Sequence, residues 1–183
     1  MKRVFDVVVA ISILMLLWPL FLVLWLLVLL TSPGGGFYKH PRVGRHCKIF
    51  TLYKFRSMVQ GADTQGYQTQ AGDARITPVG KFLRKTSLDE LPQLWNVLAG
   101  DMSLVGPRPD TPMQEKDYTP EQWHRRHSVR PGITGLAQVN GRSNMSMEDR
   151  LAWDLQYVET HGFLSDIVII FQTISVVAGK GVN

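Results

Sequence analysis

Cysteine is almost absent from this chain, which has only Cys47 among its 183 residues. A single thiol excludes an internal disulfide framework and any zinc cluster built from several thiolates. Glycine-rich phosphate loops are missing too, because the sequence contains neither G-x-G-x-x-G nor G-x-x-x-x-G-K-S/T, and it shows no internal repeat. These absences remove disulfide-rich domains, the commonest dinucleotide and nucleotide folds, and repeat proteins from the possible classes.

Acidic residues are outnumbered by basic ones. The 20 lysines and arginines exceed the 15 aspartates and glutamates, which gives a formal charge of +5. This balance suggests an anionic partner, and nucleic acid, phospholipid and phosphorylated substrates all fit. His124 and His127 are three residues apart, but the arginines between them favour a solvated basic helix face over a metal site. At this length we expect one domain.

Apolar residues are concentrated near the N-terminus. Residues 7–30 carry no charge, and Ser12 and Pro19 alone interrupt the apolar run. As a continuous helix the run would be ~36 Å long, against a hydrocarbon core of ~30 Å. It is too long for a cleaved signal peptide, and residues 31–36 offer no small-x-small cleavage site. We therefore expect a retained membrane anchor.

Two features distinguish this segment from an ordinary spanning helix. Pro19, at its middle, removes a backbone donor and is expected to break the helix. Cations flank both ends, and the positive-inside rule keeps both flanks cytoplasmic, which one crossing cannot satisfy. A re-entrant helix that returns to the same face satisfies it; a single pass with a very short translocated N-terminus is the alternative. The flanking cations are Lys2, Arg3, Lys39, Arg42, Arg45 and Lys48.

The remaining sequence predicts an α+β fold that is mostly helical. A hinge at 33–36 separates the anchor, residues 1–36, from a cytosolic, membrane-associated domain, residues 37–183. Residues 37–58 are typical of a small β-hairpin with its turn near Gly44. Residues 130–142 are expected to form a glycine-punctuated loop, and the last helix to be amphipathic, on the membrane or on the domain. The predicted helices cover residues 76–84, 91–98, 120–127, 147–161 and 163–178.

Two adjacent carboxylates, Asp89 and Glu90, stand in basic surroundings. Residues 87–90 match the S-x-x-E capping box, in which Ser87 would cap a helix and Glu90 would fold back to its amide. Pro92 weakens this interpretation because it would fall inside that helix. The alternative is a chemical role, with one carboxylate as a nucleophile. The pattern by itself leaves both interpretations open.

Several cations lie in segments that are predicted to be ordered. A carboxylate can attack phosphorus only if cations or a metal offset the repulsion between the anions. Guanidinium groups hold phosphate oxygens in a bidentate manner, and Arg108, between Pro107 and Pro109, has little backbone freedom. Taken singly, each cation is better explained as a solvated surface charge. The set comprises Lys54, Arg56, Arg75, Arg84 and Arg108.

Four long motifs occur in a specific order. They are YKFRSM at 53–58, TSLDELPQ at 86–93, GDMSLVGPRP at 100–109 and RPGITGLAQVNGR at 130–142. With them the chain resembles the bacterial sugar transferases, the monotopic phosphoglycosyl transferases, in their minimal form. The resemblance extends from the anchor to the last helix and favours the re-entrant form of the anchor.

The resemblance implies transfer of a sugar-1-phosphate from a UDP-sugar to polyprenyl (undecaprenyl) phosphate, as the first membrane step of polysaccharide or glycoprotein assembly. Asp89 would attack the sugar-side phosphorus, release UMP and form a phosphosugar-aspartyl intermediate, and Glu90 would associate with Mg²⁺. The cations implied in phosphate contacts are Arg84, Arg108 and Arg142, followed by Lys54, Arg56 and Arg75.

The same resemblance implies the cellular setting. The catalytic domain would lie on the cytoplasmic face of the bacterial inner membrane, in contact with phospholipid. Downstream glycosyltransferases would be its protein partners, and nucleic acid would have no role. The sequence departs from the family pattern at His40, where glutamine is usual, and at His46 and Cys47, which replace a polar-glycine turn. These departures concern hairpin geometry more than chemistry.

Two other functions compete with this interpretation. One is a catalytically silent, membrane-anchored scaffold that binds lipid or a sugar nucleotide, although such a protein has no chemical need for Asp89. The other is an enzyme that transfers the phosphosugar in one step, with Asp89 as a base.

Overall fold

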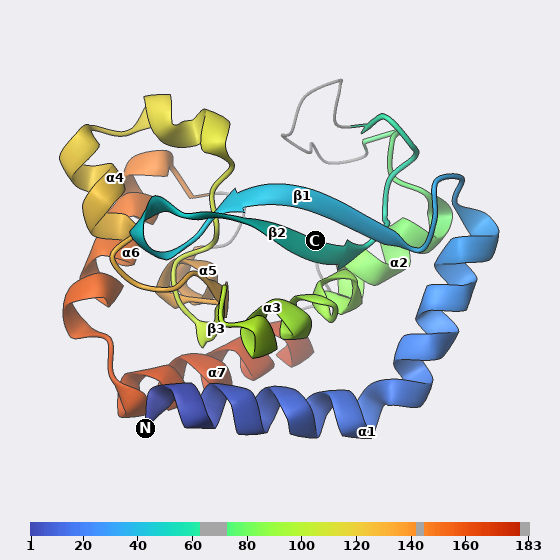
Figure 1. The fold of residues 1–183 in the computed structure, drawn as a ribbon, viewed down its shortest axis with the longest axis horizontal. Coiled ribbons are helices and arrows are strands. Elements are labelled where there is room, and N and C mark those ends of the chain that lie inside the picture. The colour runs from blue at the N-terminus through green and yellow to red at the C-terminus, as the bar shows by residue number, and fades with distance from the viewer. Residues whose placement is uncertain (63–72, 142–144, 180–183) are drawn as a thin grey trace.

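The computed structural model describes residues 1–62, 73–141 and 145–179 (Figure 1). Helices predominate, and the strands form one antiparallel and one parallel pair. The α+β class with mostly helical content is therefore confirmed. In chain order the elements are α1 (Lys2–Thr31), β1 (Phe37–Val43), η1 (Arg45–Cys47), β2 (Ile49–Phe55), α2 (Pro78–Thr86), η3 (Leu88–Glu90), α3 (Gln93–Ala99), β3 (Ser103–Val105), η4 (Pro112–Asp117), α4 (Pro120–Arg126), β4 (Gly132–Thr134), α5 (Leu136–Asn140), α6 (Met147–Thr160) and α7 (Phe163–Gly179).

The N-terminal helix α1 is long and apolar enough to cross a membrane by length and composition. Pro19 lies inside it without ending it, so the expected break is corrected to a bend in a continuous helix. Figure 1 shows α1 running along the base of the molecule and then turning up one side. A proline ring removes one hydrogen bond and clashes with the preceding turn, which kinks a helix while the flanking turns persist.

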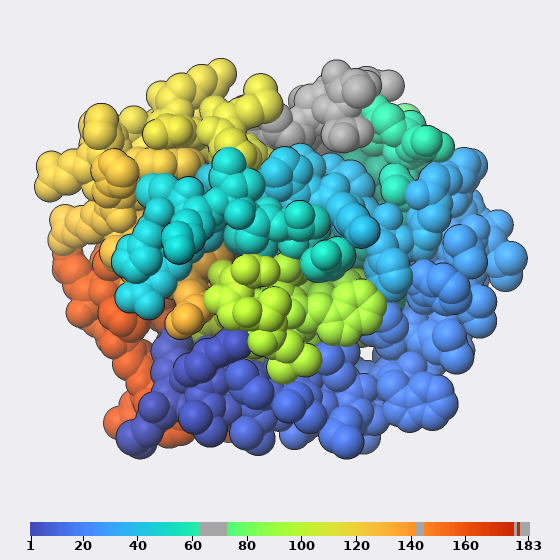
Figure 2. Space-filling model, in the orientation of Figure 1, coloured from blue at the N-terminus to red at the C-terminus, as the bar shows by residue number. Residues whose placement is uncertain are grey.

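Both arms of α1 contribute side chains to the interior. Ala10, in the first arm, is fully buried in a cluster that includes Val97 and Met102. Val28, in the second arm, is fully buried in another cluster with Leu83. The opposite faces of α1 and α7 expose large apolar side chains, and Figure 2 shows α1 along the base and one side of the surface. Exposed large apolar side chains gathered on a helix face are typical of a lipid or protein contact.

The predicted hairpin is confirmed as β1 and β2, which pair antiparallel from Phe37↔Phe55 to Val43↔Ile49. Its turn departs from the usual geometry: His46 and Cys47 both have positive φ, at 57° and 59°. That region favours glycine. The sequence departure at these two positions therefore coincides with a strained turn at the far end of the hairpin.

The five predicted helices are confirmed as α2, α3, α4, α6 and α7. Residues 130–142, in contrast, were expected to form only a loop, and they contain β4 and α5. Strand β4 pairs parallel with β3, with Ser103 opposite Gly132. Glycine lets the two backbone segments lie close together here, because a Cβ on Gly132 would lie 2.0 Å from the amide nitrogen of Gly106. Three-residue strands are too short to show alternation, so this pairing left no pattern in the sequence.

Candidate active site

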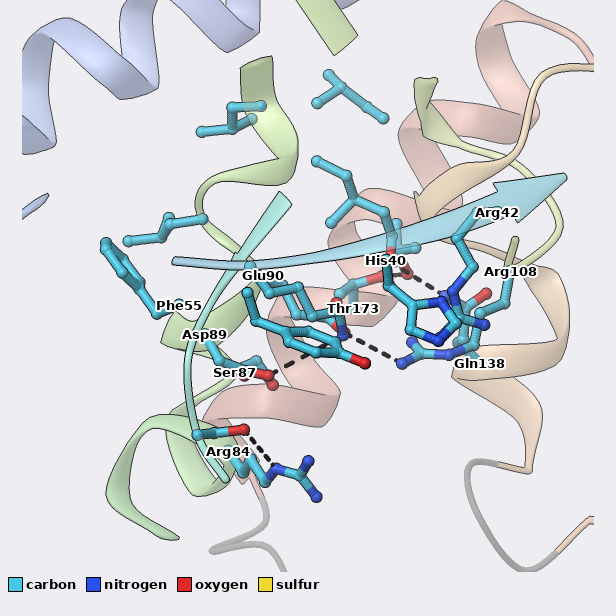
Figure 3. A pocket seen from close by; sticks show the side chains of 18 of the residues that line it. His40, Arg42, Phe55, Arg84, Ser87, Asp89, Glu90, Arg108, Gln138 and Thr173 are labelled. Atoms are coloured by element: carbon cyan, nitrogen blue, oxygen red, sulfur yellow. Dashed lines mark hydrogen bonds and ion pairs between the residues drawn. The ribbon is translucent and has the colours of Figure 1, made fainter. Parts of the chain in front are cut away.

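A cavity of about 1150 Å³ lies between the hairpin, η3, α1 and α7. One part of its wall is polar and carries Asp89, Glu90 and cations (Figure 3). The other part is apolar and is formed by side chains from α1 and α7 among others. The apolar lining includes Val9, Ile13, Ile170, Ile174 and Val177.

The two carboxylates lie in the short turn η3, between α2 and α3. Ser87 adopts a left-handed conformation with φ 57° and makes no side-chain cap, so the capping-box interpretation, one of the two left open by the sequence, is wrong. Helix α3 begins only after Pro92, which suits proline at a helix start. Glu90 therefore precedes the helix, and its side chain is directed to cations instead of to the backbone.

Glu90 is held between two cations. Its Oε1 accepts hydrogen bonds from Nζ of Lys54 at 2.6 Å and from Nη2 of Arg108 at 3.2 Å. Burial opposes ionisation of Glu90, but Lys54 and Arg108 outweigh it and lower the pKa to about 2. Glu90 is therefore a fixed anion at any physiological pH.

Asp89 has a different environment although it is the adjacent residue. It is 7% exposed, and Nζ of Lys54 is farther from it, at 4.0 Å from Oδ2. Burial raises the pKa of Asp89; Lys54 partly offsets this effect, and the neighbouring Glu90 adds to it. Two adjacent carboxylates with pKa values displaced in opposite directions are typical of sites in which acids have separate roles.

Arg84 lies close to this pair and lines the cavity. Its Nε donates to Oγ of Ser57 at 2.8 Å. Burial lowers the pKa of Arg84 and the charge of Asp89 partly restores it, which places the two side chains within electrostatic reach. Lys54, Arg84 and Arg108 are thus the predicted cations that the fold brings to the carboxylates.

The other predicted cations are placed differently. Arg56 borders the cavity, but its guanidinium donates to the carbonyls of Gly34, Gly35 and Phe37, so it fastens the hinge. Arg75 is not among the residues that line the cavity; it pairs with Asp73 and donates to the carbonyl of Ala62. Arg142 lies outside the described residues.

Arg42 lines the cavity, although the sequence predicts for it only a place among the cations that flank the anchor. It lies near Arg108 (Figure 3), and its Nη1 donates to the carbonyl of Pro109 at 3.2 Å. Burial, followed by the charge of Arg108, lowers the pKa of Arg42 to about 10. Tyr38, His40 and Arg42 all line the cavity. Their alternation along β1 was the available signal, because alternate residues of a strand share a face.

The carboxylates fit part of a magnesium site. Mg²⁺ prefers oxygen ligands and is commonly held by one or two carboxylates together with substrate phosphates and water. Among the described residues, no group of three or more His, Cys, Asp or Glu side chains could hold a metal. Asp89 and Glu90 could therefore provide two ligands at most, and phosphate oxygens or water would have to complete the coordination.

Known proteins are similar to this chain over nearly its whole length. The family model described as Bacterial sugar transferase matches residues 1–180. The undecaprenyl-phosphate galactose phosphotransferase of Salmonella typhimurium is 44% identical, over 97% of this chain and 40% of that protein. The exopolysaccharide production protein PSS of Rhizobium leguminosarum is 42% identical, over 99% of this chain and 98% of that protein.

A third relative has a name that specifies a reaction. The UDP-glucose:undecaprenyl-phosphate glucose-1-phosphate transferase of Escherichia coli K12 is 43% identical, over 95% of this chain and 39% of that protein. The chain thus spans about two fifths of the length of the Salmonella and Escherichia proteins, and nearly the full length of the Rhizobium protein.

Proposed function

We propose that this chain, which belongs to the bacterial sugar transferase family, transfers a sugar-1-phosphate from a UDP-sugar to undecaprenyl phosphate. The observation that carries the proposal is the pair Asp89 and Glu90 beside Lys54, Arg84 and Arg108, in a cavity that also has apolar wall segments from α1 and α7. The names of the Salmonella and Escherichia relatives supply the substrate classes. Polar and apolar walls in one cavity suit the phosphate and the hydrocarbon of such an acceptor.

In the first step the donor diphosphate lies against Lys54, Arg84 and Arg108. A carboxylate oxygen of Asp89 attacks the sugar-side phosphorus, an Asp89–phosphorus bond forms, and the bond from that phosphorus to the bridging oxygen breaks. UMP leaves with the electron pair. The cations compensate the repulsion between carboxylate and phosphate. Mg²⁺, when held by Glu90 with Asp89 alongside, would further neutralise the diphosphate charge.

In the second step a phosphate oxygen of the acceptor attacks the same phosphorus. The Asp89–phosphorus bond breaks, the carboxylate is regenerated, and undecaprenyl diphosphosugar is the product. Because UMP has left before the acceptor reacts, the same cations can hold the two anionic substrates in turn. This ping-pong order explains how one cavity serves a soluble donor and a lipid acceptor.

The proposed setting is the cytoplasmic face of the bacterial inner membrane. The exposed apolar faces of α1 and α7 would contact phospholipid, with the bent α1 entering and leaving on the same side. The acceptor's isoprenoid chain would then reach the phosphate site past Ile13 of α1 and Ile174 of α7, which line the cavity. Polysaccharide assembly, with downstream glycosyltransferases as partners, is the proposed pathway.

Trapping the intermediate tests the proposal. The purified chain is incubated with Mg²⁺ and UDP-sugars labelled in the sugar, without acceptor, and protein-bound label and UMP are measured. We expect label and stoichiometric UMP with the natural chain and neither with Asp89→Asn. Asp117→Asn, which changes an exposed aspartate of η4, should behave like the natural chain. Chelation of Mg²⁺ should suppress the label, and added Mg²⁺ should restore it.

The same assay separates the alternatives. Release of UMP only when acceptor is present, with no bound label, would indicate single-step transfer with Asp89 as a base. Absence of UMP and label with every donor, with or without acceptor, would favour the silent scaffold.

A further inference from the structure

The segment that carries Arg108 is held by its carbonyl groups. Pro107 and Pro109 have no backbone N–H, so this segment cannot be fixed by an ordinary strand ladder. Four consecutive carbonyls, from Pro107 to Asp110, instead each accept a hydrogen bond from a different residue. The donors are, in order, Gly132 N at 2.9 Å, Arg126 Nη2 at 2.7 Å, Arg42 Nη1 at 3.2 Å and Val43 N at 2.9 Å.

Arg126 makes the bond to Arg108 itself. Its side chain is 1% exposed, and it donates to Asp154 from Nε at 2.9 Å and lies 2.8 Å from it through Nη2. Its Nη1 donates to Asp110. Burial disfavours the charge, but the two carboxylates outweigh that effect and raise the pKa of Arg126 above its ordinary value. Arg126 is thus a permanently charged, fully engaged donor beneath the segment.

The network beneath Arg108 extends to a second helix. Arg150, in α6, donates from Nη2 to Oδ1 of Asp110 at 2.6 Å and to the hydroxyl of Tyr118 at 2.9 Å. The carboxylate of Asp110 is therefore gripped by arginines from α4 and α6, while the backbone of Asp110 continues from Arg108. Helices that lie far from η3 in the sequence thereby determine where Arg108 sits.

We propose that Arg126 is a positioning residue for Arg108, and that its bond to the Arg108 carbonyl directs that guanidinium toward Glu90 and the substrate phosphate. The role of Arg108 in phosphate binding rests on the proposed function. The side chain of Arg108 is 48% exposed, so its own packing constrains it little, and its direction depends on its backbone. Arg126 does not line the cavity, so it acts through Arg108.

Stability alone does not explain a buried ionic cluster here. Well-packed apolar residues often replace buried ion pairs with no loss of stability. They cannot donate to a carbonyl, and a lysine, with its single flexible ammonium, cannot reproduce three directed bonds of a guanidinium. The geometry of these hydrogen bonds therefore explains why residue 126 is an arginine.

The kinetic test is a double-mutant cycle. Arg126→Lys should lower kcat/KM for adduct formation roughly tenfold or more. In an Arg108→Ala background the same change should have almost no further effect, because coupled residues are non-additive. Arg125→Lys, the adjacent exposed position paired with Glu159, should leave the rate unchanged. A loss of equal size in both backgrounds would assign Arg126 a general structural role and overturn the proposal.

Two further measurements complete the test: the first does not require Arg126→Lys to fold, and the second does not require turnover. Asp154→Asn removes the charge of one partner of Arg126 but keeps an acceptor oxygen, so it should show the same non-additivity with a smaller loss. The guanidinium NMR signal of Arg108 is assigned by its loss in Arg108→Ala. In Glu90→Gln this signal marks an Arg108 that has lost its charged partner. In Asp154→Asn and in Arg126→Lys the signal should move toward that position. It should stay in place in Arg125→Lys. An unmoved signal in folded variants contradicts the proposal even if the chain transfers no sugar, which separates this failure from failure of the proposed function.

Discussion

Nζ of Lys54 lies 2.6 Å from Oε1 of Glu90, which joins strand β2 to the turn η3. The same nitrogen is 4.0 Å from Oδ2 of Asp89. Phe55, the next residue of β2, is 1% exposed, so packing of the hairpin sets the position of Lys54. One cation thus links the two carboxylates whose pKa values are displaced in opposite directions.

The first prediction concerns pH. Adduct formation requires ionised Asp89, and burial raises the pKa of Asp89 above 3.8. The rate should therefore fall as the pH drops through this raised pKa. Lys54 lowers that pKa, so Lys54→Met should shift the acidic limb of the pH–rate profile to higher pH. UMP release without acceptor, measured as a function of pH, checks this.

Lys48→Met is the matched control, because Lys48 is exposed at the other end of the hairpin. Its profile should coincide with that of the natural chain. A limb that stays in place in Lys54→Met would show that Asp89 is not the titrating group.

The second prediction concerns the order of the carboxylates. The double variant Asp89→Glu with Glu90→Asp keeps the charge but lengthens the nucleophile by one methylene and shortens the side chain that reaches Lys54 and Arg108. Adduct formation should fall on the order of 10³-fold or more. Label trapping in the swapped variant measures it, and near-normal labelling would mean that the two carboxylates are interchangeable.

The third prediction concerns stability. Asn96 is 1% exposed; its Oδ1 accepts from the amide of Tyr53 at 3.1 Å, and its Nδ2 donates to the carbonyl of Thr51 at 2.7 Å. Asn96→Ala leaves these two backbone groups of β2 without partners and should lower the free energy of unfolding by roughly 2–4 kcal/mol. Denaturant unfolding in detergent provides the measurement. Asn140→Ala, which removes an exposed bond to Leu136, should cost less than about 0.5 kcal/mol.

The fourth prediction concerns the path of the acceptor. Ile174→Trp enlarges a side chain that lines the cavity and should slow transfer from the trapped adduct to undecaprenyl phosphate roughly tenfold. Adduct formation should be unchanged. Phe171→Trp, on the same helix and similarly exposed but not among the cavity residues, should affect neither step. Equal loss in both steps would place the obstruction at the phosphate site instead.

Much of the fold was predictable because its signals are local. The charge-free run of residues 7–30 predicted the long helix α1, and helix-like spacing of apolar residues predicted α2. Gly100, with φ 96°, ends α3 close to the predicted end at residue 98, since glycine adopts this conformation without a steric penalty. The capping box failed because Pro92, which lies next to it, defined the start of α3 instead.

The site was predictable only in part. The residue types and the motifs around them identified Asp89, Glu90 and Arg108 as candidate site residues. The fold places all three at one cavity. Arg75 was grouped with them because its segment was predicted to be ordered, although it pairs with Asp73, two residues away. Arg42 joins the cavity because β1 directs alternate side chains toward it.

Three features follow from residues that are neighbours in the chain: the apolar length of α1, the order of hairpin and helices, and the adjacency of a potential nucleophile and a potential metal ligand. Folding adds the pairing of Glu90 with Lys54 and Arg108 and the position of Arg126 beneath Arg108. Helix spacing and turn chemistry act within a few residues, so they leave a pattern in the chain. Charge pairing depends on distance in space. Packing sets that distance, and it brings together segments that are far apart in the sequence and show no shared sequence pattern.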